Sequence, residues 1–271
     1  MKPTTATILA ATMALTATGG VVSSASRSDG GRQLAKLPDV CEQRPGRSAR
    51  FEEAKLLIEY NATDGDIGVH GAFDDEGWRE LCVLDPDGRP IAVFDPAGRL
   101  DRLGMAGVFF ESREPPLDEF DFDDLARAFP EGKYRVRAVS FDGEALVGRA
   151  VFTHDVPRSP EITAPELAED AEAPGRPIDR REVVVRWNDV TRTVAGDPVD
   201  ITGYEVIVTK EDAEDRNGFS RPVYDVHVGP DRNSLSVPSE FFDRRSVYEV
   251  EVLALEVSGN QTISVGFFRT A

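Results

Sequence analysis

Short runs of alternating apolar and polar residues recur through most of the chain, and this pattern constrains the fold more than any other feature. Examples are AKLLIEY (54–60), PIAVF (90–94) and YRVRAVS (134–140). Turn-forming residues separate such runs: DPDG (85–88) and DPAG (95–98) both place Asp, Pro and Gly where type I turns favour them. Period-two alternation bounded by turn residues is typical of strands. The chain is therefore predicted to be mainly β.

One segment has the spacing of a helix. Between Phe122 and Phe129 the apolar residues fall at i, i+3, i+4 and i+7. Asp121 can cap the first turn, and Pro130 cannot continue a helix. The sequence predicts one short helix over 121–129.

The first 25 residues have the layout of a cleavable secretory signal. Lys2 provides a basic start, an apolar run extends from Ile8 to Val22, and small residues lead to a cleavage site after Ala25. A membrane anchor is the alternative, but Thr, Gly and Ser interrupt the run, whereas a spanning helix needs ~20 predominantly apolar residues. We expect an exported protein, secreted or periplasmic, with no membrane insertion after signal cleavage. Its basic residues are mostly arginine, which we interpret as the composition of a GC-rich bacterium.

Net charge narrows the range of partners. The chain has 31 basic and 49 acidic residues, for a net charge of −18. Such an acidic excess repels phosphate backbones and anionic lipid headgroups. We expect no nucleic-acid partner.

The two cysteines, Cys41 and Cys82, are expected to pair. Disulfides persist in oxidising compartments, and an exported chain with two cysteines has one possible bridge. Two unpaired thiols, one of them buried as a small hydrophobic group, are the alternative.

Composition divides the chain into segments. We predict a signal peptide over 1–25, an N-terminal arm over 26–50, a first sandwich over 51–157, a linker over 158–180 that is rich in Pro, Ala and acidic residues, and a second sandwich over 181–271.

The acidic stretch NATDGDIGVHGAFDDEGW (61–78) raises the question of a metal site. A strand over 66–73 rises ~3.3 Å per residue, so the carboxylates at its two ends cannot share one ion. If 66–73 and 78–84 were antiparallel, the DPDG turn would return to the start of the first strand. The candidate ligands of a calcium ion are then Asp64, Asp66, Asp85 and Asp87. Turn-capping carboxylates in water are the alternative, and no other cofactor is indicated.

Catalytic motifs are absent from the sequence. There is no nucleophile elbow, zinc-protease motif or phosphate loop. His70, His154 and His227 lie within predicted strands and are interpreted as structural. Two carboxylates such as Glu111 and Glu114 can perform glycoside hydrolysis, but a loop at the exit of a strand is the preferred explanation of this pair.

Three stretches of the second half together resemble a fibronectin type III domain. They are VVVRW (183–187), ITGYEVIV (201–208) and YEVEVLA (248–254), the last followed by Gly259-Asn260. The resemblance implies that Trp187 packs between two sheets near Tyr204 or Tyr248, and that Tyr248 forms a tyrosine corner. By contrast, Trp78 stands beside the DDEG stretch and is expected to be partly exposed.

The first half resembles bacterial immunoglobulin-like sandwiches in outline, because FPEGKY (129–134) precedes a closing hairpin. The expected architecture is two tandem β-sandwiches, the first immunoglobulin-like and the second fibronectin type III-like. By analogy this implies a non-enzymatic exported binding or adhesion module for a carbohydrate or a cell-envelope or extracellular protein. The alternative is a secreted enzyme or a calcium-binding accessory protein that uses acidic loops of the first half.

Overall fold

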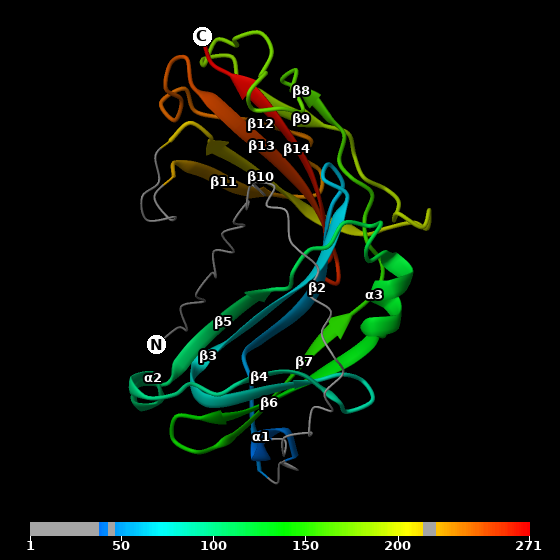
Figure 1. Cartoon of the computed structure of the whole chain (residues 1–271), viewed down its shortest axis with the longest axis vertical. Helices are drawn as coiled ribbons and strands as arrows, with labels where there is room; N and C mark the ends of the chain where they lie inside the picture. The colour runs from blue at the N-terminus through cyan, green and yellow to red at the C-terminus, as the bar shows by residue number, and fades with distance from the viewer. Residues whose placement is uncertain (1–37, 43–46, 214–220) are drawn as a thin grey trace, which may run out of the picture.

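The computed structural model describes residues 38–42, 47–213 and 221–271 of the chain. The predicted signal peptide and most of the N-terminal arm lie outside these residues. The described residues consist mainly of strands, with three short helices (Figure 1). The prediction of a mainly β fold is confirmed.

The first half contains seven strands and the three helices. In chain order these are α1 (Asp39–Glu42), β1 (Ala49–Arg50), β2 (Glu53–Asn61), β3 (Asp66–Leu84), β4 (Pro90–Phe94), α2 (Arg99–Leu103), β5 (Met105–Glu111), α3 (Phe122–Ala128), β6 (Gly132–Ser140) and β7 (Ala145–Phe152). The predicted helix is α3, and Asp121 caps it through the N–H of Asp124. The sequence did not predict α1 and α2.

Strand β3 corrects the expectation of two antiparallel strands over 66–73 and 78–84, because both belong to this one strand of 19 residues. Its first part pairs with β2 and β5, and its last part pairs with β4 and β6. The register shifts between Asp74 and Trp78, where the DDEG stretch forms an irregularity in place of a tight turn. Asp75 stabilises this irregularity, since its carboxylate accepts the Glu52 N–H at 2.9 Å.

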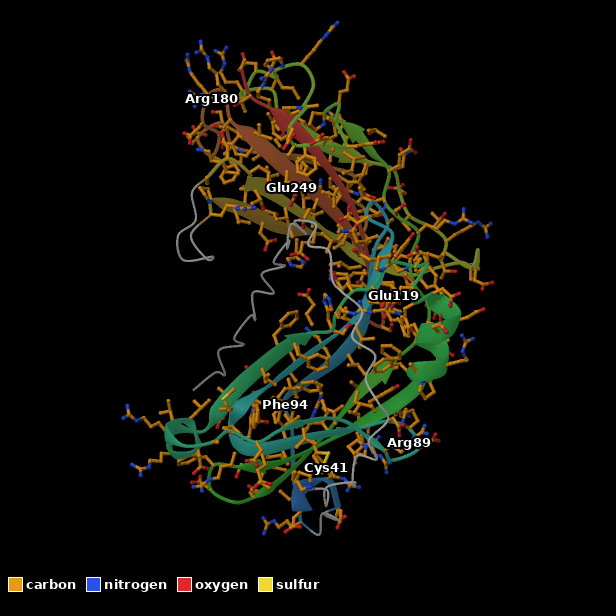
Figure 2. The ribbon with its side chains drawn as sticks, viewed as in Figure 1. Cys41, Arg89, Phe94, Glu119, Arg180 and Glu249 are labelled. Atoms are coloured by element: carbon orange, nitrogen blue, oxygen red, sulfur yellow. A yellow bond between two sulfur atoms is a disulfide. The ribbon has the colours of Figure 1, made fainter. Side chains whose placement is uncertain are left out.

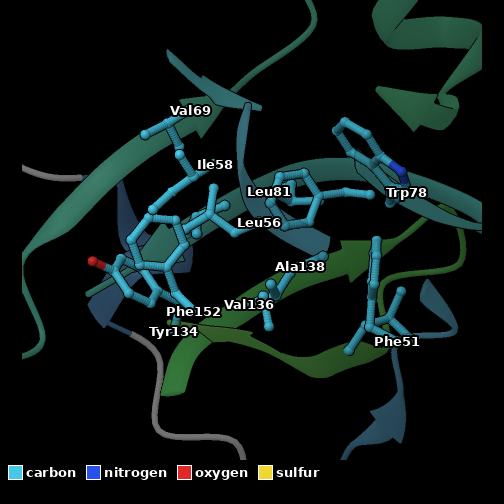
Figure 3. Close-up of a cluster of buried hydrophobic side chains, with 14 of the residues drawn as sticks. Phe51, Leu56, Ile58, Val69, Trp78, Leu81, Tyr134, Val136, Ala138 and Phe152 are labelled. Carbon is cyan, nitrogen blue, oxygen red and sulfur yellow. The ribbon is translucent and has the colours of Figure 1, made fainter. Parts of the chain in front are cut away.

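The core of the first half contains buried side chains from both parts of β3 and from the strands that pair with them (Figure 3). Trp78 is fully buried there, and its Nε1 donates to the carbonyl of Ala106 at 3.0 Å. The expectation that Trp78 is partly exposed is therefore wrong. Large side chains from β2, β6 and β7 fill the same core, among them Leu56, Ile58, Tyr134 and Phe152.

The disulfide Cys41–Cys82 is present, with the Cα atoms 5.4 Å apart, which confirms the predicted pairing. Val40 and Cys41 of α1 pack against Cys82 and Leu84 of β3. The bridge attaches the N-terminal arm to the sheet and closes a loop with a sequence separation of 41. On the chain-entropy model a loop of this size stabilises the fold by roughly 4 kcal/mol.

The second half is a sandwich of three strands on four. Its strands are β8 (Ile162–Ala164), β9 (Val184–Trp187), β10 (Ile201–Lys210), β11 (Val223–Val228), β12 (Ser234–Ser236), β13 (Val247–Glu256) and β14 (Gln261–Arg269). The order β12-β9-β8 forms one sheet, and β14-β13-β10-β11 forms part of the other.

Trp187 from the smaller sheet packs between the two layers of this sandwich. Its ring centroid lies 5.4 Å from that of Tyr204, and both residues belong to one buried cluster with Tyr248. The two tyrosine hydroxyls accept backbone N–H groups, from Val190 at 2.9 Å and Asp243 at 2.7 Å respectively. These bonds satisfy the polar ends of two aromatic side chains that the core otherwise surrounds.

A short parallel pairing between β2 and β14 joins the two halves into one sheet. Its order is β1-β7-β6-β3-β2-β14-β13-β10-β11. In the register, Glu59, Tyr60 and Asn61 lie beside Gln261, Thr262 and Ile263 respectively. In Figure 1 the red strand β14 descends from the upper half to meet β2 at the waist of the molecule.

Asn260 reinforces this seam between the halves. Its Oδ1 accepts the N–H of Ile58 at 2.8 Å, and its Nδ2 donates to the carbonyl of Thr153 at 3.1 Å. Asn260 is buried, so both bonds are sheltered from water. The two halves are therefore joined both by backbone pairing of β2 with β14 and by the side-chain hydrogen bonds of Asn260.

The segment 158–180, expected as a linker, packs on the second sandwich over much of its length. It contains β8, which pairs with β9. Ala168 and Phe267 exchange two backbone hydrogen bonds of 2.8 Å, and the Ile178 N–H donates to the Arg269 carbonyl at 2.8 Å. Its Pro-, Ala- and acid-rich composition indicated a linker, and composition alone does not show these contacts because they depend on residues distant in sequence.

Candidate functional site

One face of the joined sheet carries acidic, histidine and apolar side chains, and we call it the acid–histidine face. Side chains alternate along a strand, so the residues between the core positions point to this opposite face. In the second half the core takes Tyr204, Val206 and Val208, which leaves Glu205 and Ile207 on the acid–histidine face. In the first half the core takes Ile58, which leaves Glu59 on the same side as its partner Gln261. The seam thus makes the face continuous between the halves.

At the waist, His70 of β3 lies between two carboxylates. Its Nε2 is 2.9 Å from Glu114 Oε1, and its Nδ1 is 3.6 Å from Glu59 Oε2. Gln261 of β14 donates its Nε2 to Glu59, and Glu111 of β5 pairs with His70 in the strand register. We call Glu59, His70 and Glu114 the junction cluster.

Burial and neighbouring charges together set the pKa values of Glu59 and His70. Burial raises the pKa of Glu59 to about 7, and this effect exceeds the opposing influence of His70 and of the Gln261 hydrogen bond. Burial lowers the pKa of His70, but the hydrogen bond to Glu114 and the charge of Glu59 raise it above its ordinary value overall. Glu59 and His70 therefore hold their protons more strongly than free side chains do.

Further along the face, Glu205, Asp225 and His227 form a second group, which we call the edge cluster. Glu205 lies opposite His227 in the pairing of β10 with β11, and its Oε1 is 3.4 Å from His227 Nε2. Burial raises the pKa of Glu205 to about 8, and the neighbouring Asp225 reinforces the effect. Within each cluster, one donor atom from each of the three residues lies within 4.8 Å of the other two, a separation compatible with binding one metal ion.

Two further buried glutamates lie on β13 between the clusters. Glu249 and Glu251 are each 5 % exposed. Burial raises the pKa of Glu251 well above its ordinary value, and its neighbour Glu249 adds to this effect. Around them an apolar cluster of Ile207, Leu253 and Ile263 keeps water away. The face therefore combines low polarity with an excess of carboxyl groups.

The structure does not bring the four predicted calcium ligands together. Asp66 begins β3 and Asp85 follows its far end, because the two expected strands are one. Asp85 and Asp87 instead bind Arg89, at 2.9 and 2.7 Å, while Asp64 accepts a hydrogen bond from Asn61 at 3.0 Å. Figure 2 labels Arg89 toward the end of the first half that carries Cys41, away from the waist.

The remaining sequence candidates lie on or near the acid–histidine face, with one exception. His70 and His227 are members of the two clusters, whereas His154 lies apart from both and its Nε2 donates to the carbonyl of Phe129 at 2.8 Å. Glu114 belongs to the junction cluster beside Glu111. The reasoning from sequence missed Glu59, Glu205 and Asp225. The alternation Asp225-x-His227 was the local signal that could have indicated the edge cluster.

Removing the charge of Glu59 is expected to stabilise the protein at alkaline pH. The unfolded chain has the ordinary pKa of 4.5 and the folded protein about 7, so the folded state binds this proton more tightly. Stability from this group is therefore full below pH 4.5 and is lost as the pH rises through about 7. The raised pKa of His70 acts in the same direction, since its stabilisation is lost above its folded pKa.

Glu59→Gln removes the pH-dependent contribution of Glu59 to stability. A shift from 4.5 to about 7 corresponds to roughly 3 kcal/mol, so the variant is expected to exceed the wild type by that order at about pH 8.5, and by under ~1 kcal/mol at about pH 5. Denaturant unfolding at both pH values measures the difference. The exposed Glu169→Gln is the matched control. Equal stability of wild type and Glu59→Gln at both pH values would show that Glu59 carries no buried charge.

No protein-family model and no curated protein matches this chain. Among solved structures it is similar to chicken CNTN1 FN1-FN3 domains, with 12% identity and a TM-score of 0.32, over 83% of this chain and 69% of that one.

Two further similar structures have 13% identity. One is a tetra-tandem repeat in the extending region of a large adhesion protein, with a TM-score of 0.27, over 81% of this chain and 50% of that one. The other is the BSP domain of a biofilm-associated protein, with a TM-score of 0.23, over 81% and 29%.

The fold thus defines a mainly β protein whose second half is a β-sandwich of three strands on four. No helix in the described ranges combines the length and the apolar character that crossing a bilayer requires.

Proposed function

We propose that the protein is an exported, non-enzymatic binding or adhesion module that engages a protein of the cell envelope or extracellular space through the acid–histidine face. The observation that carries this proposal is the continuity of that face over the seam between β2 and β14. The disulfide supports export, because such bridges persist in oxidising compartments.

Charge and exposure indicate the kind of partner. The buried glutamates of the face favour a cationic group, since a positive charge offsets the cost of ionising them. The rim is accessible: Phe109 and Val223 are 42 % and 51 % exposed, and the side chain of His227 is 65 % exposed. Apolar contacts at a rim beside buried acids suit a protein surface that carries Lys or Arg.

A secreted glycosidase is the alternative that Glu111 and Glu114 suggested. Such enzymes hold two carboxyl groups across a sugar-binding cleft. Two hollows on the described surface, of about 570 and 400 Å³, are lined by residues such as Ala49, Arg50 and Glu52, and neither of these two includes Glu111 or Glu114. Glu114 is bound to His70 instead. This arrangement supports the binding function over hydrolysis.

The proposal is tested by capture from a cell-envelope fraction with the purified mature protein. Wild type is compared with Phe109→Lys/His227→Lys, which adds positive charge to the rim, and with Val151→Lys, which adds positive charge at an exposed position on β7 in the first half. We expect one protein to bind wild type and Val151→Lys equally, to be lost with the rim variant because like charges repel, and to dissociate at high salt.

Equal capture by all three proteins would place the binding surface elsewhere. Binding to a glycan array in place of a protein would make the partner a carbohydrate, and turnover of a glycan would support the enzyme.

A further inference from the structure

We propose that Glu205, Asp225 and His227 of the edge cluster bind a divalent transition-metal ion of the zinc type. This inference goes beyond the proposed binding function and stands independently of it.

The pairing of β10 with β11 brings the side chains of Glu205, Asp225 and His227 close together. Asp225 and His227 are two residues apart on β11, so both point to the same face of the sheet. Glu205 on β10 lies directly opposite His227 in the register. One donor atom from each of the three residues lies within 4.8 Å of the other two.

The separation of two of these donors matches zinc. Glu205 Oε1 and His227 Nε2 are 3.4 Å apart. Ligands at about 2.1 Å from a tetrahedral zinc ion lie about 3.4 Å from each other. Imidazole nitrogen together with carboxylate oxygen is a usual zinc donor set, whereas Ca²⁺ takes six to eight oxygens.

An orphaned oxygen at the site, Asp225 Oδ1, is the second, independent observation. Asp225 Oδ1 is buried and has no hydrogen-bond partner among the described residues, and Glu205 is only 5 % exposed. Glu251, on the same face, also has a buried Oε2 without a partner. Buried carboxylate oxygens without donors are costly, and a cation between Glu205 and Asp225 removes that cost.

The junction cluster does not offer the same site. Glu114 lies against one ring nitrogen of His70 and Glu59 against the other, so the imidazole is held between two carboxylates. A metal would have to displace one of them. In the edge cluster Glu205 and Asp225 leave the exposed side of His227 open, and three protein ligands leave a fourth position for water or a partner's side chain.

An ion at this position would also fix the edge of the sheet. Strand β11 ends the described strand order, and an edge strand has unpaired backbone groups on one side. Coordination by residues of both β10 and β11 ties this edge strand to its neighbour.

Titration calorimetry of the tag-free mature protein with ZnCl₂ tests the proposal, with absorption of the Co²⁺-loaded protein as the spectroscopic readout. We expect one Zn²⁺ per chain and the visible bands of tetrahedral Co²⁺. His227→Gln and Asp225→Asn are expected to weaken zinc binding at least about tenfold and to abolish the bands. His154→Gln, a histidine outside both clusters, is expected to bind like wild type.

The His227 side chain is 65 % exposed, so its replacement leaves the core intact, and circular dichroism verifies the fold of each variant. Absence of zinc binding by the wild type, or unchanged binding by both edge variants, would overturn the proposal. Loss of binding in His70→Gln but not in His227→Gln would assign the ion to the junction cluster instead.

Discussion

Replacing Trp78 by alanine is expected to destabilise the protein by ~3–5 kcal/mol, the usual cost of removing a large buried aromatic side chain. Trp78 is fully buried in the core of the first half. The substitution leaves a cavity and also removes the donor that bonds the Ala106 carbonyl at 3.0 Å. Domains of this size have a total stability of ~5–15 kcal/mol, so the first half would lose much of its margin.

Denaturant unfolding followed by circular dichroism measures this loss. Val151→Ala, at a 53 % exposed position on β7, is the control and is expected to change stability by less than ~0.5 kcal/mol. If Trp78→Ala behaved like this control, the core of the first half would not enclose the indole as described.

The second large effect is expected for Trp187→Ala in the sandwich of the second half. Trp187 is 2 % exposed and packs against Tyr204, so its removal is also expected to cost ~3–5 kcal/mol. Its Nε1 is buried without a hydrogen-bond partner among the described residues. Trp187→Phe, which removes this unpaired donor and keeps an aromatic ring, is therefore expected to cost clearly less.

Differential scanning calorimetry measures the loss of stability in Trp187→Ala and in Trp187→Phe. Val257→Ala, at a 66 % exposed position after β13, is the control. A wild-type melting profile for Trp187→Ala would show that the indole does not pack between the sheets.

Most strands could be predicted because their signals are local. The alternation in 54–60, 90–94 and 134–140 corresponds to β2, β4 and β6. The helix spacing and the Asp121 cap likewise depend on neighbours in sequence. Cys41 and Cys82 paired as expected because the chain has only two cysteines.

The interpretation of β3 failed because a local signal was ambiguous. The DDEG stretch has the composition of a tight turn, yet Asp75 uses its carboxylate to bind Glu52 across the sheet. The wrong turn then placed Asp85 and Asp87 beside Asp64 and Asp66. The wrong turn also placed Trp78 beside an exposed loop. In the structure the strand continues through Trp78, and the side chain is buried in the core.

The acid–histidine face could not be predicted from the sequence, because it depends on pairings between distant strands. Glu59 and Gln261 are separated by 202 residues, and no local pattern indicates that they are neighbours. The edge cluster similarly depends on the register of β10 with β11. Isolated acidic residues on predicted strands look like solvated side chains until the register places them together.

Hydrogen exchange at the seam is the most direct test of the central claim, that the two halves form one sheet with a continuous face. The Ala62 N–H donates to the Ile263 carbonyl at 3.0 Å, and the Ile58 N–H donates to Asn260 at 2.8 Å. We expect both amides to exchange as slowly as those in the centre of β13, and Asn260→Ala to accelerate them without affecting β13. Fast exchange of both amides in the wild type would contradict the account, because the halves would then be separate sandwiches without a shared face.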